Sequence, residues 1–401
     1  MPTNYYRKYL IIAIVFSVLG CDTQKTTSSI PNVEEKKQPI TLRFIGEKII
    51  PIDKTFGKGN EKMTVGGISG IDYDAENDIY YLLSDDLFDE NGRLRFYTTK
   101  LEYTQQSFEN IEIISQNFLK QANGEYYPKK EEGAKIADPE SICFSDKTKT
   151  LFWASEGDRE RNILPFIAEM DTNGNQIRKI ELPSHLTDTT KDKGWYHNAA
   201  IEAVALYKDE EEICFLTETP LQQDGEKIHS TEGVFPIRWM FVDRETSIFE
   251  KEIVYLAEAV AKEPIPKTAF GLNGIVEIVE WKTEKSTDSE SQIFLALERS
   301  YSEGHEREAN TVKLFWVETE GTTDTKNIVS LKNMIPNKDY IPAKKTLIAD
   351  FYPLGLEYVD NIEGMSFGKT LENGNKTLVF VSDNNFRSEQ KTQLLVFEVI
   401  E

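Results

Sequence analysis

The chain has 401 residues, of which 39% are hydrophobic and 11% aromatic, and its formal net charge is −22. This composition supplies enough apolar side chains for a sizeable core, and it excludes a chain that is disordered throughout. The strong negative charge repels nucleic acid and anionic lipid head groups, so we expect neither as a partner of the folded body.

The N-terminus has the pattern of a targeting segment. Arg7 and Lys8 precede an apolar run, Leu10–Leu19, that is too short to span a bilayer. The run leads into Gly20-Cys21, which resembles a bacterial lipobox, in which cleavage leaves Cys21 as the lipid-modified N-terminus. A plain secretion signal with an incidental cysteine is the alternative. We expect an exported lipoprotein that is anchored in the cell envelope, in the periplasm or at the outer membrane, through this lipid alone.

The rest of the chain divides into two parts. Residues 22–39 are polar and rich in Ser, Thr, Lys and Pro, which favours a flexible tether behind a signal peptide of residues 1–21. In residues 40–401, short runs rich in Ile, Val, Phe, Tyr and Trp alternate with turn residues, and no long 3.6-residue period appears. This pattern indicates a single all-β domain, which we expect to be monomeric.

One hairpin unit is repeated five times along this domain. Each copy begins at a corner with a Gly or an acid, forms two short strands around a polar turn, and closes on an acid. The copies are GGISGIDYDAENDIYYLLSDD from Gly66, ADPESICFSDKTKTLFWASEGD from Ala137, AAIEAVALYKDEEEICFLTETP from Ala199, GLNGIVEIVEWKTEKSTDSESQIFLALERS from Gly271 and DNIEGMSFGKTLENGNKTLVFVSDNN from Asp360.

The spacing of the remaining strand-like runs predicts how the repeats close. Two such runs follow each of the first four copies, but only QLLVFEVI follows the fifth. TLRFIGEKII, from Thr41, would supply the missing strand, as in a ring-closed β-propeller. We therefore predict an all-β fold, a five-bladed β-propeller closed by an N-terminal strand. A sixth blade in Lys332–Asp350 or Glu258–Phe270 is an alternative count, and a β-sandwich with coincidental repeats is an alternative fold.

The hairpin geometry predicts a shared site. The first residue of an antiparallel hairpin lies beside the last, so corners and closing acids of all five blades should meet at one mouth of the central channel. So many carboxylates need cations, protonation or nearby Arg, and Ca²⁺ prefers oxygen ligands. Capping of each corner by its own acid is the alternative. We assign catalytic roles to Glu140, Glu202 and Glu363, and metal binding to Asp85, Glu156, Glu218, Asn273, Glu298 and Asp383.

Arginines follow the closing acids in four of the copies. A guanidinium group offers a planar fork that matches phosphate or carboxylate, so a small anionic substrate is expected. Internal pairing that neutralises the acids is the alternative. The cysteines of the domain, Cys143 and Cys214, lie in apolar strands and are expected to be buried free thiols. The substrate-binding candidates are Arg95, Arg159, Arg299 and Arg387.

Several phrases of the chain resemble the phytase-like family, which is also described by an esterase-like activity of phytase. They are GISGIDYD, ADPESICF, IEAVAL, LALERSY and NIEGMSFG with SDNNF, and the resemblance runs from about Leu42 to Val399. It implies a propeller-like, secreted or envelope protein that hydrolyses phosphate esters or other esters.

Two functions are compatible with this pattern. The first is a metal-dependent hydrolase of phosphate esters, in which a cation near Glu140, Glu202 and Glu363 activates water and the arginines hold the anion. The second is a non-catalytic propeller that binds a glycan, a peptide or an envelope partner, with cations serving only stability.

Overall fold

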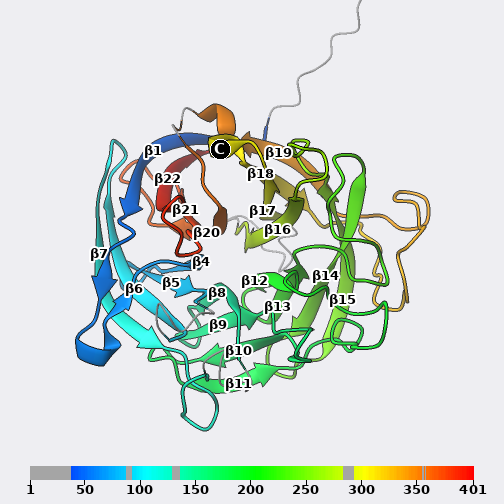
Figure 1. The fold of residues 1–401 in the computed structure, drawn as a ribbon, viewed down its shortest axis with the longest axis horizontal. Helices are drawn as coiled ribbons and strands as arrows, with labels where there is room; N and C mark the ends of the chain where they lie inside the picture. The colour runs from blue at the N-terminus through cyan, green and yellow to red at the C-terminus, as the bar shows by residue number, and fades with distance from the viewer. Residues whose placement is uncertain (1–37, 87–92, 129–135, 283–292, 355, 357) are drawn as a thin grey trace, which may run out of the picture. The chain divides into compact units, whose positions relative to one another are not determined.

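The repeated hairpins form the inner strands of five antiparallel sheets in a computed structural model of the protein. Figure 1 shows these sheets arranged as blades around a centre, with β4, β8, β12, β16 and β20 innermost. The structure describes residues 38–86, 93–128, 136–282, 293–354, 356 and 358–401. Cys21 and the predicted signal therefore lie outside the described residues, as does nearly all of the predicted tether.

The first three blades follow the chain in order. Blade one consists of β4 (Ile68–Asp74), β5 (Ile79–Ser84), β6 (Arg95–Tyr103) and β7 (Phe108–Phe118). Blade two consists of β8 (Pro139–Ser145), β9 (Thr150–Ser155), β10 (Phe166–Met170) and β11 (Gln176–Ile180). Blade three consists of β12 (Ile201–Tyr207), β13 (Glu212–Thr217), β14 (Val234–Asp243) and β15 (Phe249–Glu258).

The last two blades complete the ring. Blade four consists of β16 (Gly271–Glu280), β17 (Ile293–Ser302), β18 (Asn310–Glu318) and β19 (Lys344–Asp350). Blade five consists of β20 (Ile362–Gly368), β21 (Thr377–Ser382), β22 (Thr392–Ile400) and β1 (Thr41–Ile50). Smaller elements are β2 (Thr55–Phe56), β3 (Met63–Thr64) and the 3₁₀ turns η1 (Gly59–Glu61), η3 (Glu306–Glu308) and η4 (Tyr352–Leu354).

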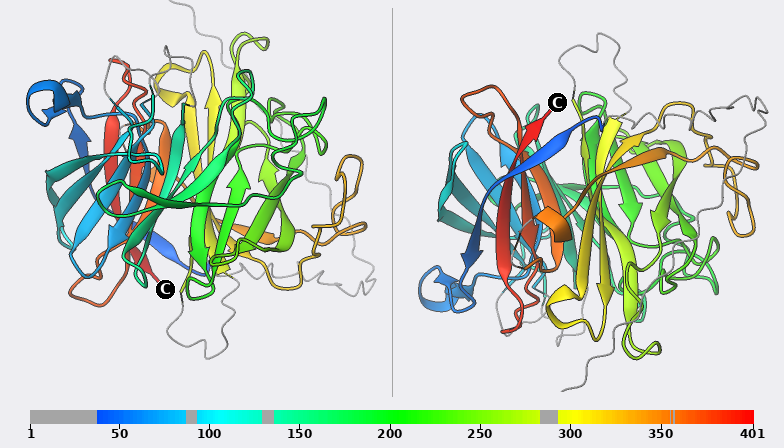
Figure 2. Two further views of the ribbon diagram at one scale, coloured as in Figure 1. Left: turned by 90° about the horizontal axis from the view of Figure 1, so that it is seen from below. Right: turned by 90° about the horizontal axis from the view of Figure 1, so that it is seen from above.

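Ring closure occurs as the sequence predicts. The N-terminal strand β1 pairs antiparallel with β22, from Thr41 opposite Ile400 to Ile50 opposite Thr392. The five-bladed count is confirmed, and the alternative sixth blade is wrong. Lys332–Asp350 contributes only β19 to blade four, and Glu258–Phe270 leads from β15 to β16. The two side views in Figure 2 show the long segment between β18 and β19 extending outward from the sheets.

The hydrophobic core is divided among the junctions between blades. Each of five clusters of buried side chains draws on two neighbouring blades; one combines Tyr81 and Phe96 of blade one with Trp153 of blade two. Each sheet buries both faces in this way, which explains the nearly continuous apolar runs of the inner strands. Cys143 and Cys214 are buried free thiols in two different clusters, as predicted for buried thiols. Among the described residues, no helix is long and apolar enough to cross a bilayer.

Every inner strand contains one extra residue near its start, which shifts the pairing register of the hairpin. Such a β-bulge bends the strand and re-aims a side chain, and bulges are common beside functional sites. The bulged residues are Ser69, Glu140, Glu202, Val276 and Glu363. The bulge therefore gives an internal measure by which the five blades can be aligned.

Candidate active site at the channel mouth

A cavity of about 680 Å³ lies at the ends of the inner hairpins where the bulges occur. Eight of the predicted site residues line it, and they come from all five blades or the loops that follow their strands. They are Asp85, Glu140, Glu202, Glu218, Glu363, Asp383, Arg299 and Arg387. The structure thus brings most of the predicted ring together.

The closing acids are positioned by backbone hydrogen bonds at the hairpin ends. In each case the acid's N–H donates to the carbonyl two residues before the bulge: Glu156 to Asp138 at 3.0 Å and Glu218 to Ala200 at 2.8 Å. Asp85 and Asp383 make the same bond in blades one and five, at 2.7 and 2.9 Å. The geometry repeats because the bulge repeats, so Asp85, Glu218 and Asp383 all line the cavity, and Glu156 lies beside Glu140, which also lines it.

Blade four departs from this pattern and corrects the sequence alignment. At its bulge Ile275 pairs with Glu298, as Ile201 pairs with Thr217 in blade three. Arg299 therefore occupies the closing-acid position, and Val276 occupies the bulge.

The prediction that Asn273 and Glu298 belong to the mouth is wrong. It places the end of the hairpin at Glu298, whereas the strand pairing places it one residue later, at Arg299. Neither residue lines the cavity. The Glu298 carboxylate accepts hydrogen bonds from Tyr255 Oη at 2.6 Å, Lys345 Nζ at 2.6 Å and Asn273 Nδ2 at 3.0 Å. The Glu298 carboxylate therefore neutralises the charge of Lys345 and accepts the hydrogen bonds of donor groups between blades three and four.

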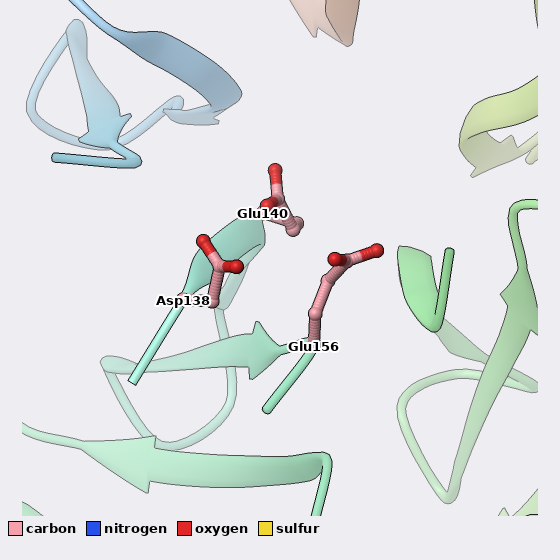
Figure 3. A group of neighbouring side chains, drawn as sticks. All are labelled: Asp138, Glu140 and Glu156. Carbon is pink, nitrogen blue, oxygen red and sulfur yellow. The ribbon is translucent and has the colours of Figure 1, made fainter. Parts of the chain in front are cut away.

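Blade two presents a group of carboxylates that fits a cation. One oxygen from each of Asp138, Glu140 and Glu156 lies within 4.8 Å of the others. Figure 3 shows Asp138 and Glu140 at the start of β8 and Glu156 just beyond the end of β9. Glu156 is 1% exposed; its Oε1 accepts from the Ala200 N–H at 2.8 Å, whereas Oε2 has no hydrogen-bond donor among the described residues. A buried acceptor without a donor is the situation that a bound cation relieves.

Burial and mutual repulsion disturb the protonation of the mouth. Burial raises the pKa of Asp85, Glu140 and Glu202 well above the ordinary range, and neighbouring carboxylates raise each further. The pKa of Asp383 is raised to about 8, by burial first and by Glu363 second. Without cations, Asp383 therefore holds its proton at neutral pH.

Arg299 is the cationic counterpart of these acids. Its Nη2 donates to Glu363 Oε1 at 2.7 Å and lies 3.5 Å from Glu218 Oε1. Burial raises the pKa of Glu218 to about 7, although Arg299 opposes this shift. The Nε atom of Arg299 is buried and has no hydrogen-bond acceptor within the described part of the chain. The mouth thus contains a buried donor without an acceptor and, on Glu156, a buried acceptor without a donor.

Two other predicted arginines serve the fold, and they correct the sequence prediction. Arg95 is fully buried and donates to Asp86 Oδ2 at 2.7 Å, to Tyr97 Oη at 2.6 Å and to the Thr64 carbonyl at 2.7 Å. Substrate binding by Arg95 is therefore wrong, and internal pairing holds instead.

Arg159 donates to carbonyl groups of its neighbouring loop, including that of Lys193 at 2.8 Å, and stacks 4.8 Å above the Trp195 ring. It does not line the cavity. Of the predicted arginines, Arg299 and Arg387 therefore remain as candidates for substrate binding.

Sequence reasoning missed several residues of the mouth. Asp138 stands two residues before the bulge, where the equivalent blade positions hold Gly67, Ala200, Gly274 and Asn361, so only the register could reveal it. Asn361 Nδ2 donates to Glu363 Oε1 at 3.0 Å. The missed aromatic side chains that line the cavity are Phe270 and Phe386.

A second cavity of about 590 Å³ is lined by later residues of the same inner strands. Its walls combine apolar side chains such as Ile142 and Phe367 with the buried acid Glu277. None of the predicted site residues lines it. At the other end of the inner hairpin of blade one, the segment DYDAEND from Asp72 forms a plain turn: Asp74 Oδ1 accepts the N–H groups of Glu76 and Asn77, at 3.0 and 3.2 Å.

The family comparison agrees with the repeats and the acidic mouth. The sequence model of the phytase-like family, described as esterase-like activity of phytase, matches residues 63–386. The chain belongs to the phytase-like family. The matched range includes every residue that lines the mouth except Gln390 and Arg387.

The other comparisons add little. No curated protein matches the chain. Among solved structures, the chain is similar to one titled "Structure of Dos1 propeller", with 7% identity and a TM-score of 0.31 over 82% of this chain and 68% of that one.

Proposed function

We propose that this phytase-like propeller is a cation-dependent hydrolase of phosphate esters, held at the bacterial cell envelope by a lipid on Cys21. The observation that carries the proposal is the replacement of the closing acid by Arg299 in blade four. It sets one buried guanidinium group, whose Nε has no acceptor among the described residues, in the same cavity as Asp138 and Glu140 of blade two.

The residues of blade two fit a hard cation such as Ca²⁺. Asp138, Glu140 and Glu156 would hold it, with Glu202 beside them, since Glu202 is the neighbouring charge that most raises the Glu140 pKa. When bound, such a cation polarises a phosphoryl oxygen and lowers the pKa of water.

Arg299 would bind the phosphoryl group through Nε and orient it. The oxygen of a water molecule would form the new bond to phosphorus while the bond from phosphorus to the alcohol oxygen breaks. A carboxylate beside Arg299 would take the proton of that water, and the departing alcohol oxygen would receive a proton from solvent at the open mouth. Glu218, with a pKa of about 7, is suited to this exchange at neutral pH.

The test is hydrolysis of p-nitrophenyl phosphate by the chain from Gln38 onward, a segment that forms one compact unit. We expect turnover with Ca²⁺ and its loss with EDTA. Glu140→Gln and Glu363→Gln should each reduce turnover at least 100-fold while the protein stays folded. Glu320→Gln, at an exposed acid, is the matched control and should behave as the parent chain.

The outcomes also separate the non-catalytic alternative. If no phosphate ester is hydrolysed with any divalent cation while Ca²⁺ still raises the melting temperature, the cation is structural and the proposal fails. The Cys21 anchor is tested separately: Cys21→Ser should move the protein from the membrane fraction to the soluble fraction.

A further inference from the structure

Three aromatic side chains form part of the lining of the acidic mouth. Phe270, Tyr301 and Phe386 line the same cavity as Arg299. Phe270 is 50% exposed, with its ring centroid 6.1 Å from that of Tyr301 and 5.7 Å from that of His229. An apolar cluster with a polar surround is typical of a ligand groove, whereas single exposed apolar residues are ordinary.

Backbone contacts hold Phe270 in place at this edge. The Phe270 N–H donates to Glu303 Oε2 at 2.9 Å, and the Glu303 N–H donates back to the Phe270 carbonyl at 2.9 Å. The ring therefore stays beside the cavity although half of its surface meets solvent.

Phe386 is fixed at a higher conformational cost. Asn385 and Phe386 both adopt left-handed backbone conformations, with φ of 46° and 52°. The Phe386 ring packs on Gly67, where an added Cβ would lie 2.4 Å from Phe386 Cε2. Such strained residues persist where the surrounding structure fixes them, and they concentrate at ligand sites.

The charges of the mouth limit which ligands can bind beside these aromatic rings. The lining includes nine carboxyl groups but only the two guanidinium groups of Arg299 and Arg387. A ligand with several phosphates would meet far more negative than positive charge, even after one cation is bound. A single phosphate, in contrast, matches the one buried guanidinium group.

We propose that the mouth selects monophosphate esters of an aromatic or apolar alcohol and discriminates against compounds that carry several phosphates. The inference rests on the hydrolase function proposed above. The phosphate lies against Arg299, and the alcohol's ring packs on Phe270 and Tyr301, where offset or edge contacts between rings are favourable.

Binding can be tested without turnover. In calorimetric titrations with Ca²⁺ present, phenylphosphonate should bind at least tenfold more tightly than methylphosphonate or fructose 1,6-bisphosphate. Phe270→Ala should reduce the preference for the phenyl group to less than threefold and leave methylphosphonate binding unchanged. Ile248→Ala, at a 58% exposed site outside the mouth, is the control and should keep the preference. Equal binding of the two phosphonates, tighter binding of the bisphosphate, or no binding at all would overturn the inference.

Kinetics then separate the two proposals. Phenyl phosphate should show a kcat/KM at least tenfold above that of methyl phosphate. If both esters are hydrolysed equally well, the hydrolase stands and the selectivity is wrong. If phenylphosphonate binds preferentially but neither ester is hydrolysed, the hydrolase is wrong and the ligand preference stands.

Discussion

Blade four and the other four blades use the same bulged hairpin but deliver opposite charges. In blades one, two, three and five the hairpin closes on a carboxyl group, whereas blade four closes on Arg299. Its bulge also replaces a polar residue by Val276, which joins the hydrophobic cluster between blades four and five. A fixed backbone geometry therefore leaves the charge of each position free to vary, and one blade in five places a guanidinium group among the carboxyl groups of the mouth.

The largest effect is expected when blade four is given the same charge as the other four blades. Arg299→Glu removes the partner of Glu363 and Glu218 and adds another carboxylate, so we expect a loss of about 3–5 kcal/mol in the free energy of unfolding. Urea denaturation without divalent cations measures this change. The milder Arg299→Ala should lower kcat/KM roughly 10²–10³-fold, as for removal of one charge-stabilising donor. Unchanged stability in Arg299→Glu would show that the pairing contributes little.

The acids of the other blades should make stability fall as pH rises. The pKa of Asp383 is about 8 and that of Glu218 about 7 in the folded protein, above the values near 4 of an unfolded chain. Between these limits the folded state binds more protons, so the free energy of unfolding decreases with increasing pH. We expect the cation-free melting temperature to drop on the order of 5 °C between pH 5 and pH 8. Saturating Ca²⁺ should raise the melting temperature more at pH 8 than at pH 5. A larger increase at pH 5 would contradict the conclusion that the folded state binds more protons than the unfolded state.

Blade two offers a sharper test of the cation. Glu156→Gln removes a buried charge whose Oε2 lacks a donor, so the cation-free protein should become more stable by about 1 kcal/mol. The same change should weaken Ca²⁺ binding at least tenfold, because it removes one of three close carboxylates. Thermal unfolding and calorimetry measure the two effects, with Glu320→Gln as the exposed control. A change that weakens stability with and without Ca²⁺ alike would assign Glu156 to the fold alone.

The smallest effect should separate the two outer arginines. Arg387 is exposed and lines the mouth, so Arg387→Ala should raise KM for phenyl phosphate roughly fivefold, in keeping with about 1 kcal/mol for an exposed ionic contact. Arg159 donates to carbonyl groups of a neighbouring loop, so Arg159→Ala should change KM less than twofold. Steady-state kinetics on both variants decide the point, and equal effects would remove the distinction.

The repeat, the closing strand and most of the acidic ring could be predicted from the amino-acid sequence alone. Strand periodicity and ring closure depend on local pattern and on the count of strands, which a single chain displays. The closing acids at Asp85, Glu156, Glu218 and Asp383 could be found because equal hairpins place equal positions at one rim.

Only the tertiary structure decided how blade four joins that ring. A bulge adds one residue to a strand without a recognisable change in the sequence, and the turn of blade four is long. The sequence pattern therefore predicts that the hairpin closes at the nearest acid, Glu298. The strand pairing gives this closing position to Arg299. Hydrogen bonding decided the arginines in the same way: Arg95 and Arg159 follow closing acids as Arg387 does, but their guanidinium groups donate to other groups of the fold. Charge at a site depends on which side chains share a cavity, and spacing along the chain does not contain that information.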